Sequence, residues 1–192
     1  QKKESIQEIG TTDRPLRVIS VGRLEWKKGY EHALQAVRLL SDKGVEVTYH
    51  IIGDGNYKTP LYFARHQLNL TGTVEFFGLL PHNEVLEKLA WADVLLHPSL
   101  SEGFCNVVLE AQAMGLPVVC SDAGGLPENV LNGVTGYVVP RRDPLAMAEK
   151  LAVLAKDGEL RRRMGLAGRK RVETHFRLED QLDAFETFYQ HL

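Results

Sequence analysis

The stretch ADVLLHPSLSEGFCNVVLEAQAMGLPVVCSD, residues 92–122, carries one complete repeat of the pattern that organises this chain. It starts with the short apolar run DVLLHPS, continues into the helix-like run CNVVLEAQAM, and ends in a second strand-sized run, PVVCSD. Gly115 stands between the last two runs, as expected of a residue that ends a helix. Because parallel strands need crossover connections that usually contain a helix, the stretch predicts strand, helix and parallel strand.

The same alternation recurs along the rest of the chain. Apolar residues at helical spacing, as in YEHALQAVRLL, follow each strand-sized run, and Asp143-Pro144 supplies a helix N-cap with proline at the first helical position. Six such units predict an α/β fold, a Rossmann-like doubly wound parallel sheet of about six strands with helices on both faces. Strands are expected at 16–22, 45–53, 73–78, 93–99, 117–122 and 136–140, and helices at 30–40, 57–70, 83–92, 105–114, 126–131, 144–155, 159–174 and 178–190.

Length and composition fit one globular domain with its own core. The chain has 192 residues, of which 44% are hydrophobic. We expect a polar lead or interdomain linker at 1–14 and a single Rossmann-like domain at 15–192. Because the chain starts with Gln1 and a polar segment, we interpret it as a domain cut from a larger protein.

Charge and cysteine content narrow the class of protein. Lys and Arg total 23 against 25 for Asp and Glu, so the net charge of −2 provides no overall field for nucleic acid, and no nucleic-acid partner is expected. Cys105 and Cys120 are too few for a disulfide framework and predict free thiols. The apolar runs are strand-sized and the start lacks a signal-peptide core, which predicts a cytoplasmic protein.

Glu102 and Glu110 lie eight positions apart, beside the carboxyl end of one predicted strand, where ligands bind in such sheets. If the helix begins near Phe104, the two carboxylates are about 12 Å apart along its axis. Glycosidase carboxylates lie about 5 to 10 Å apart, so we interpret these glutamates as two contacts to an extended ligand. The alternative is that Glu102 is an exposed loop residue and Glu110 a solvated helix residue.

The start of the same helix is suited to an anion. Gly103 and the next backbone N–H groups lie at the predicted helix N-terminus, where unpaired donors and the helix dipole favour phosphate. A sugar at Glu102, phosphates at the helix start and a ribose at Glu110 together predict a nucleotide sugar as the ligand.

Two cations lie in the loop GRLEWKKG after the first predicted strand. Arg23 offers a planar fork and Lys28 a point charge, a combination with the chemistry to neutralise a diphosphate. The alternative is a solvated basic loop. Because the chain has no D-x-D carboxylate pair, we predict no metal ion in the reaction and expect such side chains to balance a departing diphosphate.

Three further features give weaker signals. GDGN supplies Gly53 and Gly55 of a dinucleotide fingerprint whose third glycine is missing, so we interpret it as a tight turn with contacts at the ligand's edge. We interpret His97 in LLHPS as a packing residue at a strand end. Six basic residues between Arg161 and Arg171 predict a solvated helix face, with docking to an anionic membrane as the alternative.

Taken in order, the motifs resemble one family. SVGRLEWKKGYEHALQAVRLL, IIGDGN, VEFFGLLP, the run from ADVLLHPS to PRRDP and the final FYQHL are similar to the C-terminal domain of retaining GT-B fold glycosyltransferases, glycosyltransferase family four. The resemblance covers nearly the whole chain from Arg17, and Glu102 and Glu110 match the family's E-x7-E motif. The detailed sequence is also similar to bacterial exopolysaccharide transferases of the colanic acid type.

The resemblance implies a role for each matching residue. Arg23 and Lys28 match the pair that holds the donor's diphosphate, and Glu102 matches the glutamate that contacts donor-sugar hydroxyls; these three form the expected catalytic set. Glu110 matches the glutamate that holds the ribose. The expected donor-binding set is Glu110, Gly103, Phe104, Cys105, Asn106, Leu80 and Gly53, in which the amides of 103–106 hold sugar and phosphate and the backbone of Leu80 faces the nucleobase.

The resemblance also implies a reaction. A hexose would pass from a UDP- or GDP-linked donor to a glycan, lipid or small-molecule acceptor, with retention and without a metal. The implied course is a front-face substitution in which the leaving diphosphate helps to deprotonate the acceptor. Enzymes of this kind place the active site between two domains, so the expected partner is an N-terminal acceptor-binding domain, which this chain lacks.

We therefore expect the chain to bind donor nucleotide without transferring sugar by itself. The alternatives are a nucleotide-sugar-binding module or a sugar-nucleotide epimerase of the same fold, without transferase activity. An NAD-binding oxidoreductase is disfavoured by the incomplete glycine fingerprint at Gly53 and Gly55.

Overall fold

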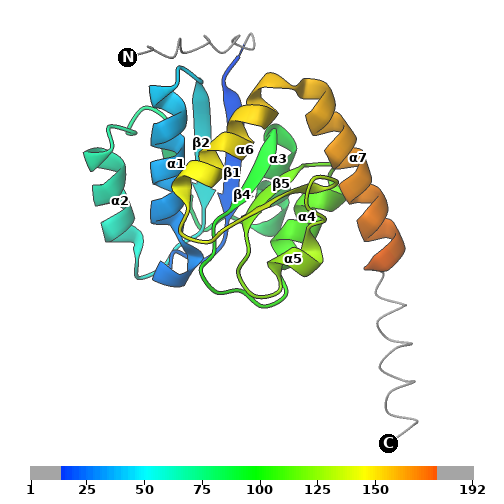
Figure 1. Cartoon of the computed structure of the whole chain (residues 1–192). Coiled ribbons are helices and arrows are strands. Elements are labelled where there is room, and N and C mark those ends of the chain that lie inside the picture. Colours follow the sequence, from blue (N-terminus) through cyan, green and yellow to red (C-terminus); the bar gives the residue numbers. More distant parts are fainter. Residues whose placement is uncertain (1–13, 177–192) are drawn as a thin grey trace, which may run out of the picture.

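The computed structural model describes residues 14–176, which form a six-stranded sheet in the order β3-β2-β1-β4-β5-β6 (Figure 1). Every neighbouring pair of strands is parallel. The doubly wound, Rossmann-like α/β fold predicted from the sequence is therefore confirmed. The strands are β1 (Leu16–Val21), β2 (Val47–Ile52), β3 (Val74–Gly78), β4 (Val94–His97), β5 (Val118–Ser121) and β6 (Gly136–Val139).

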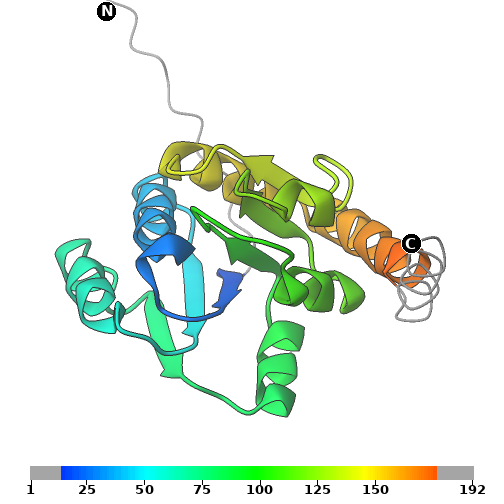
Figure 2. The same ribbon diagram turned by 90° about the horizontal axis from the view of Figure 1, so that it is seen from below.

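Helices cover both faces of the sheet (Figure 2). One face packs against α1, α2 and α6 together with the start of α7, and the other packs against α3, α4 and α5. The helices are α1 (Tyr30–Asp42), α2 (Lys58–Gln67), α3 (His82–Trp91), α4 (Asn106–Ala113), α5 (Leu126–Asn129), α6 (Pro144–Lys156) and α7 (Gly158–His175), with a short 3-10 helix η1 (Trp26–Lys28) before α1.

The central strands explain why both faces need cover. In β1, Val18 packs into the core beneath α1 and α6, whereas its neighbour Ile19 packs into the core beneath α3, α4 and α5. Successive side chains of a strand point to opposite faces, so a strand covered on both sides is apolar throughout rather than alternating. All four residues of β4 are buried, in agreement with the continuous apolar run seen in the sequence.

The ends of the helices follow their local sequence signals. The Asp143 side chain accepts a hydrogen bond of 2.9 Å from the Ala146 backbone N–H and caps α6, and Gly115 takes a positive φ of 80° just beyond α4. Cys105, the first residue of the helix expected at 105–114, is the N-cap with extended φ −110°, and α4 begins one residue later at Asn106. The expected helix at 178–190 and most of the lead at 1–14 lie outside the described residues.

The basic residues predicted in the last described helix lie on α7. Several of these side chains have partners inside the domain, so the solvated face and docking to an anionic membrane both stay predictions. The contacts join Arg161 to the carbonyls of Leu154 and Ala155, Arg162 to Glu159, Arg169 to Glu173, and Arg171 to the carbonyl of Glu128. Among residues 14–176, no helix combines the length and apolarity that crossing a membrane requires.

Candidate functional site

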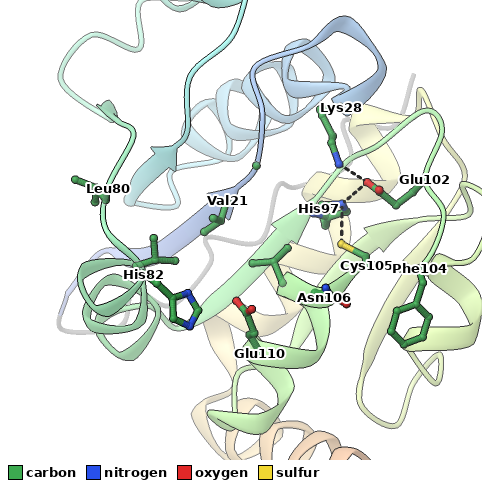
Figure 3. A pocket seen from close by; sticks show the side chains of 13 residues that line it. Val21, Lys28, Leu80, His82, His97, Glu102, Phe104, Cys105, Asn106 and Glu110 are labelled. Carbon is green, nitrogen blue, oxygen red and sulfur yellow. Dashed lines mark hydrogen bonds and ion pairs between the residues drawn. The ribbon is translucent and has the colours of Figure 1, made fainter. Parts of the chain in front are cut away.

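A cavity of about 390 Å³ opens at the carboxyl end of the sheet, between β1 and β4 (Figure 3). Strand order reverses here, because β2 pairs with one edge of β1 and β4 with the other, and the loops that follow β1 and β4 therefore diverge. Seven of the ten residues predicted for the site line this cavity: Lys28, Leu80, Glu102, Phe104, Cys105, Asn106 and Glu110.

Glu102 is the centre of a hydrogen-bonded cluster in the wall of the cavity. Lys28 Nζ donates to Glu102 Oε2 at 2.6 Å, and Ser99 Oγ donates to the same oxygen at 3.0 Å. His97 Nε2 lies 3.0 Å from Oε2 and 3.4 Å from Cys105 Sγ. The hydrogen bonds of the Glu102 carboxylate within the described residues all involve Oε2 and none involves Oε1.

The same contacts set the charge of the cluster. Burial alone would raise the pKa of Glu102, but hydrogen bonds from His97 and Lys28, with their positive charges, outweigh it and lower the pKa to about 2. Burial likewise lowers the pKa of His97, whereas hydrogen bonds with Cys105 and Glu102 outweigh it and raise the pKa. Glu102 is therefore ionised near neutral pH, where it accepts hydrogen bonds and has no proton to donate.

Two glycines let the loops around Glu102 approach one another. Gly29 has φ 67°, and a Cβ at this position would overlap the carbonyl oxygen of Pro98. Gly124 has φ 53°, and a Cβ there would overlap the carbonyl oxygen of Glu102 itself. Only glycine combines this backbone conformation with such close contact, so the loops after β1, β4 and β5 meet beside the cavity.

Helix α4 points its N-terminus at the cavity and carries Glu110 one turn further along. Cys105 is the N-cap residue, no side chain caps the helix, and Asn106 and Val107 line the cavity. Unpaired N–H groups and the helix dipole make this end a favourable place for an anion. Glu110 lines the same cavity and faces His82, the first residue of α3 (Figure 3).

Three predicted residues lie elsewhere. The Arg23 side chain is 72% exposed and pairs with Glu25 at 3.0 Å, so it is not among the residues that line the cavity. Gly53 packs against the backbone of Gly22, which explains its need for glycine without a ligand contact, and Gly103 is also not among the lining residues. Their roles toward a ligand stay predictions.

His97 is the main functional residue that sequence reasoning missed. Its expected burial at a strand end is confirmed, since it is only 3% exposed, but it also contacts Glu102 and lines the cavity. A polar residue closing the apolar run of β4, five positions before Glu102, was the available signal. His82 was also missed, because nothing local connects the start of α3 to α4.

Comparison with known proteins agrees with this architecture. The family described as "Glycosyl transferases group 1" matches residues 1–171. The chain belongs to this family. Its membership confirms the resemblance drawn from the sequence motifs, and the six-stranded Rossmann-like sheet is the form expected for one half of a GT-B fold.

The chain is similar to one curated protein in sequence and to one solved protein in structure. The amylovoran biosynthesis glycosyltransferase AmsK of Erwinia amylovora is 37% identical over 169 residues, which cover 85% of this chain and 42% of AmsK. The sucrose-phosphate synthase of Thermosynechococcus elongatus matches with a TM-score of 0.85 at 28% identity. The matched region covers 93% of this chain and 45% of the synthase chain. The homologues of this group 1 chain thus include named glycosyltransferases.

A more distant likeness shows the fold alone. The Anabaena protein Alr3699/HepE, whose structure was solved in complex with UDP-glucose, matches with a TM-score of 0.83 at 23% identity. The matched region covers 93% of this chain and 49% of the HepE chain. The chain spans less than half the length of the relatives it matches, 42% of AmsK and 45% of the sucrose-phosphate synthase.

Proposed function

We propose that the chain is the donor-binding domain of a retaining, metal-independent glycosyltransferase that takes a hexose from a nucleoside diphosphate sugar. The observation that carries the proposal is the joint placement of Lys28, Glu102 and Glu110 around one cavity at the N-terminus of α4. An extended ligand with hydroxyls at both ends and a negative charge between them matches this order of groups.

The proposed donor lies along α4. Its sugar hydroxyls bind Glu102, whose Oε1 is free of other contacts in the described part of the chain. The diphosphate lies between Lys28 and the first amides of α4, and the ribose hydroxyls bind Glu110. The nucleobase lies against the backbone of Leu80, on the opposite wall of the cavity.

The chemistry follows from the charges of the cluster. Glu102 is ionised and its carboxylate already contacts Lys28 and His97, so its role in the proposal is to hold the sugar rather than to attack it or to donate a proton. Lys28 and the α4 N-terminus offset the charge that develops on the leaving diphosphate, with Arg23 turning inward from its exposed position. The departing diphosphate takes the acceptor's proton on the same face, which preserves the anomeric configuration.

The acceptor side of the reaction belongs to a second domain. In the proposal, an N-terminal acceptor-binding domain closes over the cavity, and the acceptor is a glycan, a lipid or a small molecule. We also propose that the enzyme acts in the cytoplasm, with the basic face of α7 solvated; docking of this face to an anionic membrane is the alternative. Liposome binding that survives replacement of the six basic α7 residues by glutamine would remove α7 as the membrane contact.

The decisive experiment is calorimetric titration of the chain with UDP, GDP and ADP in excess EDTA, up to millimolar concentration. We expect one of the three to bind without metal, and that one identifies the donor class. If none of the three nucleotides binds, or if binding requires added Mg²⁺, the proposed donor site would be contradicted. Sugar transfer by these 192 residues alone would contradict the assignment of the acceptor site to a second domain.

A further inference from the structure

Three side chains in the wall of the cavity bring different metal-binding atoms together. His97 Nε2, Glu102 Oε2 and Cys105 Sγ all lie within 4.8 Å of one another, and their convergence is visible in Figure 3. Nε2 is the central atom, 3.0 Å from Oε2 and 3.4 Å from Sγ. An imidazole, a carboxylate and a thiol converge on one point.

The spacing fits a single tetrahedral ion. Nitrogen, oxygen and sulfur ligands at about 2.0 to 2.3 Å from zinc lie about 3.3 to 3.8 Å from one another. The two separations from His97 Nε2, 3.0 Å to Glu102 Oε2 and 3.4 Å to Cys105 Sγ, are close to this range, and Oε2 and Sγ lie within 4.8 Å of each other. The donor set is also selective, because thiolate and imidazole favour zinc-like ions over Mg²⁺ or Ca²⁺, which prefer oxygen ligands only. Small shifts of the side chains would complete the coordination.

The ligands are held by the fold and leave one side open. His97 is the last residue of β4 and is 3% exposed, and Cys105 is the N-cap residue of α4 and is 5% exposed, so neither side chain has much freedom to turn away. All three residues line the cavity, which leaves a fourth position facing its interior. Three protein ligands with one open position are the arrangement of zinc sites that exchange their fourth ligand.

Lys28 decides whether a metal can enter. Its ammonium lies 2.6 Å from Glu102 Oε2, the same oxygen that the metal would use. An ammonium ion and a divalent cation cannot both occupy this side of one carboxylate, since their charges repel at such distances. Metal binding therefore requires the Lys28 side chain to leave the Glu102 oxygen.

We propose that His97, Glu102 and Cys105 form a binding site for a zinc-like divalent ion, and that the ion and the Lys28 ammonium are alternative partners of Glu102. The inference goes beyond the proposed donor-binding function, which uses no metal. An ion held here takes away the contacts that a donor sugar and diphosphate would need. The site is thus inhibitory toward ligands of the cavity.

The test titrates the chain with Zn²⁺ by calorimetry and with Co²⁺ by absorption, without nucleotide and with a non-chelating reductant. We expect a one-to-one complex whose Co²⁺ spectrum contains a thiolate-to-cobalt charge-transfer band. Cys105→Ser should lose the band and bind at least tenfold to a hundredfold more weakly, since even outer partners of metal ligands have effects of about that size. Cys120→Ser is the matched control for loss of a buried thiol, because Cys120 lies beside His97 in the neighbouring strand but is not one of the three ligands. This variant should keep the charge-transfer band and the affinity.

Lys28→Met provides a second, independent measurement. Removing the competing ammonium should raise the affinity for Zn²⁺ several-fold, whereas a merely structural cluster would be unaffected or weakened. Absence of metal binding by the unaltered chain, or undiminished binding by folded Cys105→Ser, would overturn the site. An unchanged affinity in Lys28→Met would overturn the exchange between ammonium and metal. None of these outcomes depends on nucleotide binding, so they are distinguishable from a failure of the proposed function.

Discussion

Asp93 and Glu102 lie at opposite ends of β4, and both are carboxylates held by basic partners. Burial alone would raise the pKa of Asp93, but hydrogen bonds from the Arg14 side chain and the Arg17 backbone outweigh it and lower the pKa to about 2. The pKa of Glu102 is likewise lowered to about 2, against the effect of its burial, by His97 and Lys28. A depressed pKa by itself therefore does not distinguish the two sites.

The difference lies in how the oxygens are used. At Asp93, the Arg14 guanidinium donates to both oxygens at 2.7 Å, and the Arg17 N–H donates to Oδ2 at 2.9 Å. At Glu102, the described contacts all fall on one oxygen, and the other is available at the wall of the cavity. Both oxygens of the Asp93 carboxylate accept hydrogen bonds, and they link β1 to the start of β4. The Glu102 carboxylate is held through one oxygen, and its other oxygen has no hydrogen bond in the described residues.

The largest effect is expected from breaking the backbone contact behind Glu102. Gly124→Ala combines a left-handed backbone, at about 1 to 2 kcal/mol, with overlap against the Glu102 carbonyl, at about 1 to 3 kcal/mol. We expect the free energy of unfolding, measured in urea, to fall by about 2 to 5 kcal/mol. Gly44→Ala is the control, because Gly44 has φ 76° but open space around it, and it should cost only about 1 to 2 kcal/mol. An equal decrease in the free energy of unfolding in Gly124→Ala and Gly44→Ala would show that the overlap with the Glu102 carbonyl does not destabilise the fold.

The next effect separates the two glutamates of the cavity. Glu110→Ala should weaken binding of the free nucleoside diphosphate about ten- to hundredfold, the value of a charged hydrogen bond. Glu102→Ala should spare the free nucleotide and weaken the nucleotide sugar by a similar factor, about ten- to hundredfold. Calorimetry on both ligands measures the contrast, with exposed Glu87→Ala as a neutral control. Equal effects of both cavity variants on free nucleotide would contradict two separate contacts.

A smaller effect is expected at the opposite end of β4. Asp93→Asn should lower the free energy of unfolding by about 1 to 2 kcal/mol, because the neutral amide keeps an acceptor but loses its attraction to the arginines. Nucleotide affinity should not change. Asp42→Asn, in the exposed pair with Arg38 on α1, should cost no more than about 0.5 kcal/mol. A loss of nucleotide affinity in Asp93→Asn would contradict the view that Asp93 is a structural carboxylate and Glu102 a ligand-binding one.

The smallest effect is a dependence on pH. The pKa of Asp93 is lowered from 3.8 to about 2 in the folded chain, so its stabilisation is present above pH 3.8 and is lost as pH falls toward 2. About 1 kcal/mol should be lost by pH 3. Urea unfolding of the unaltered chain and of Asp93→Asn should therefore converge as pH is lowered over this range. A constant difference between them would contradict the pKa shift.

Local signals in the sequence were sufficient for the elements of the fold. The family resemblance predicted seven of the residues that line the cavity. Strand-sized apolar runs, helical periodicity, the Asp143 cap and the Gly115 stop predicted the described strands and α-helices. These features depend on residues close together in the chain, where composition and spacing act directly.

The chemistry of the site depends on contacts that no local pattern contains. Lys28 and Glu102 are 74 residues apart, and the pair forms because β1 and β4 are neighbours in the sheet and glycines let their loops meet. The same packing turned His97 from a presumed core residue into a partner of Glu102 and left Arg23 facing solvent. Periodicity determines which strands and helices form, whereas side-chain partners depend on long-range packing, since burial and charge act through space.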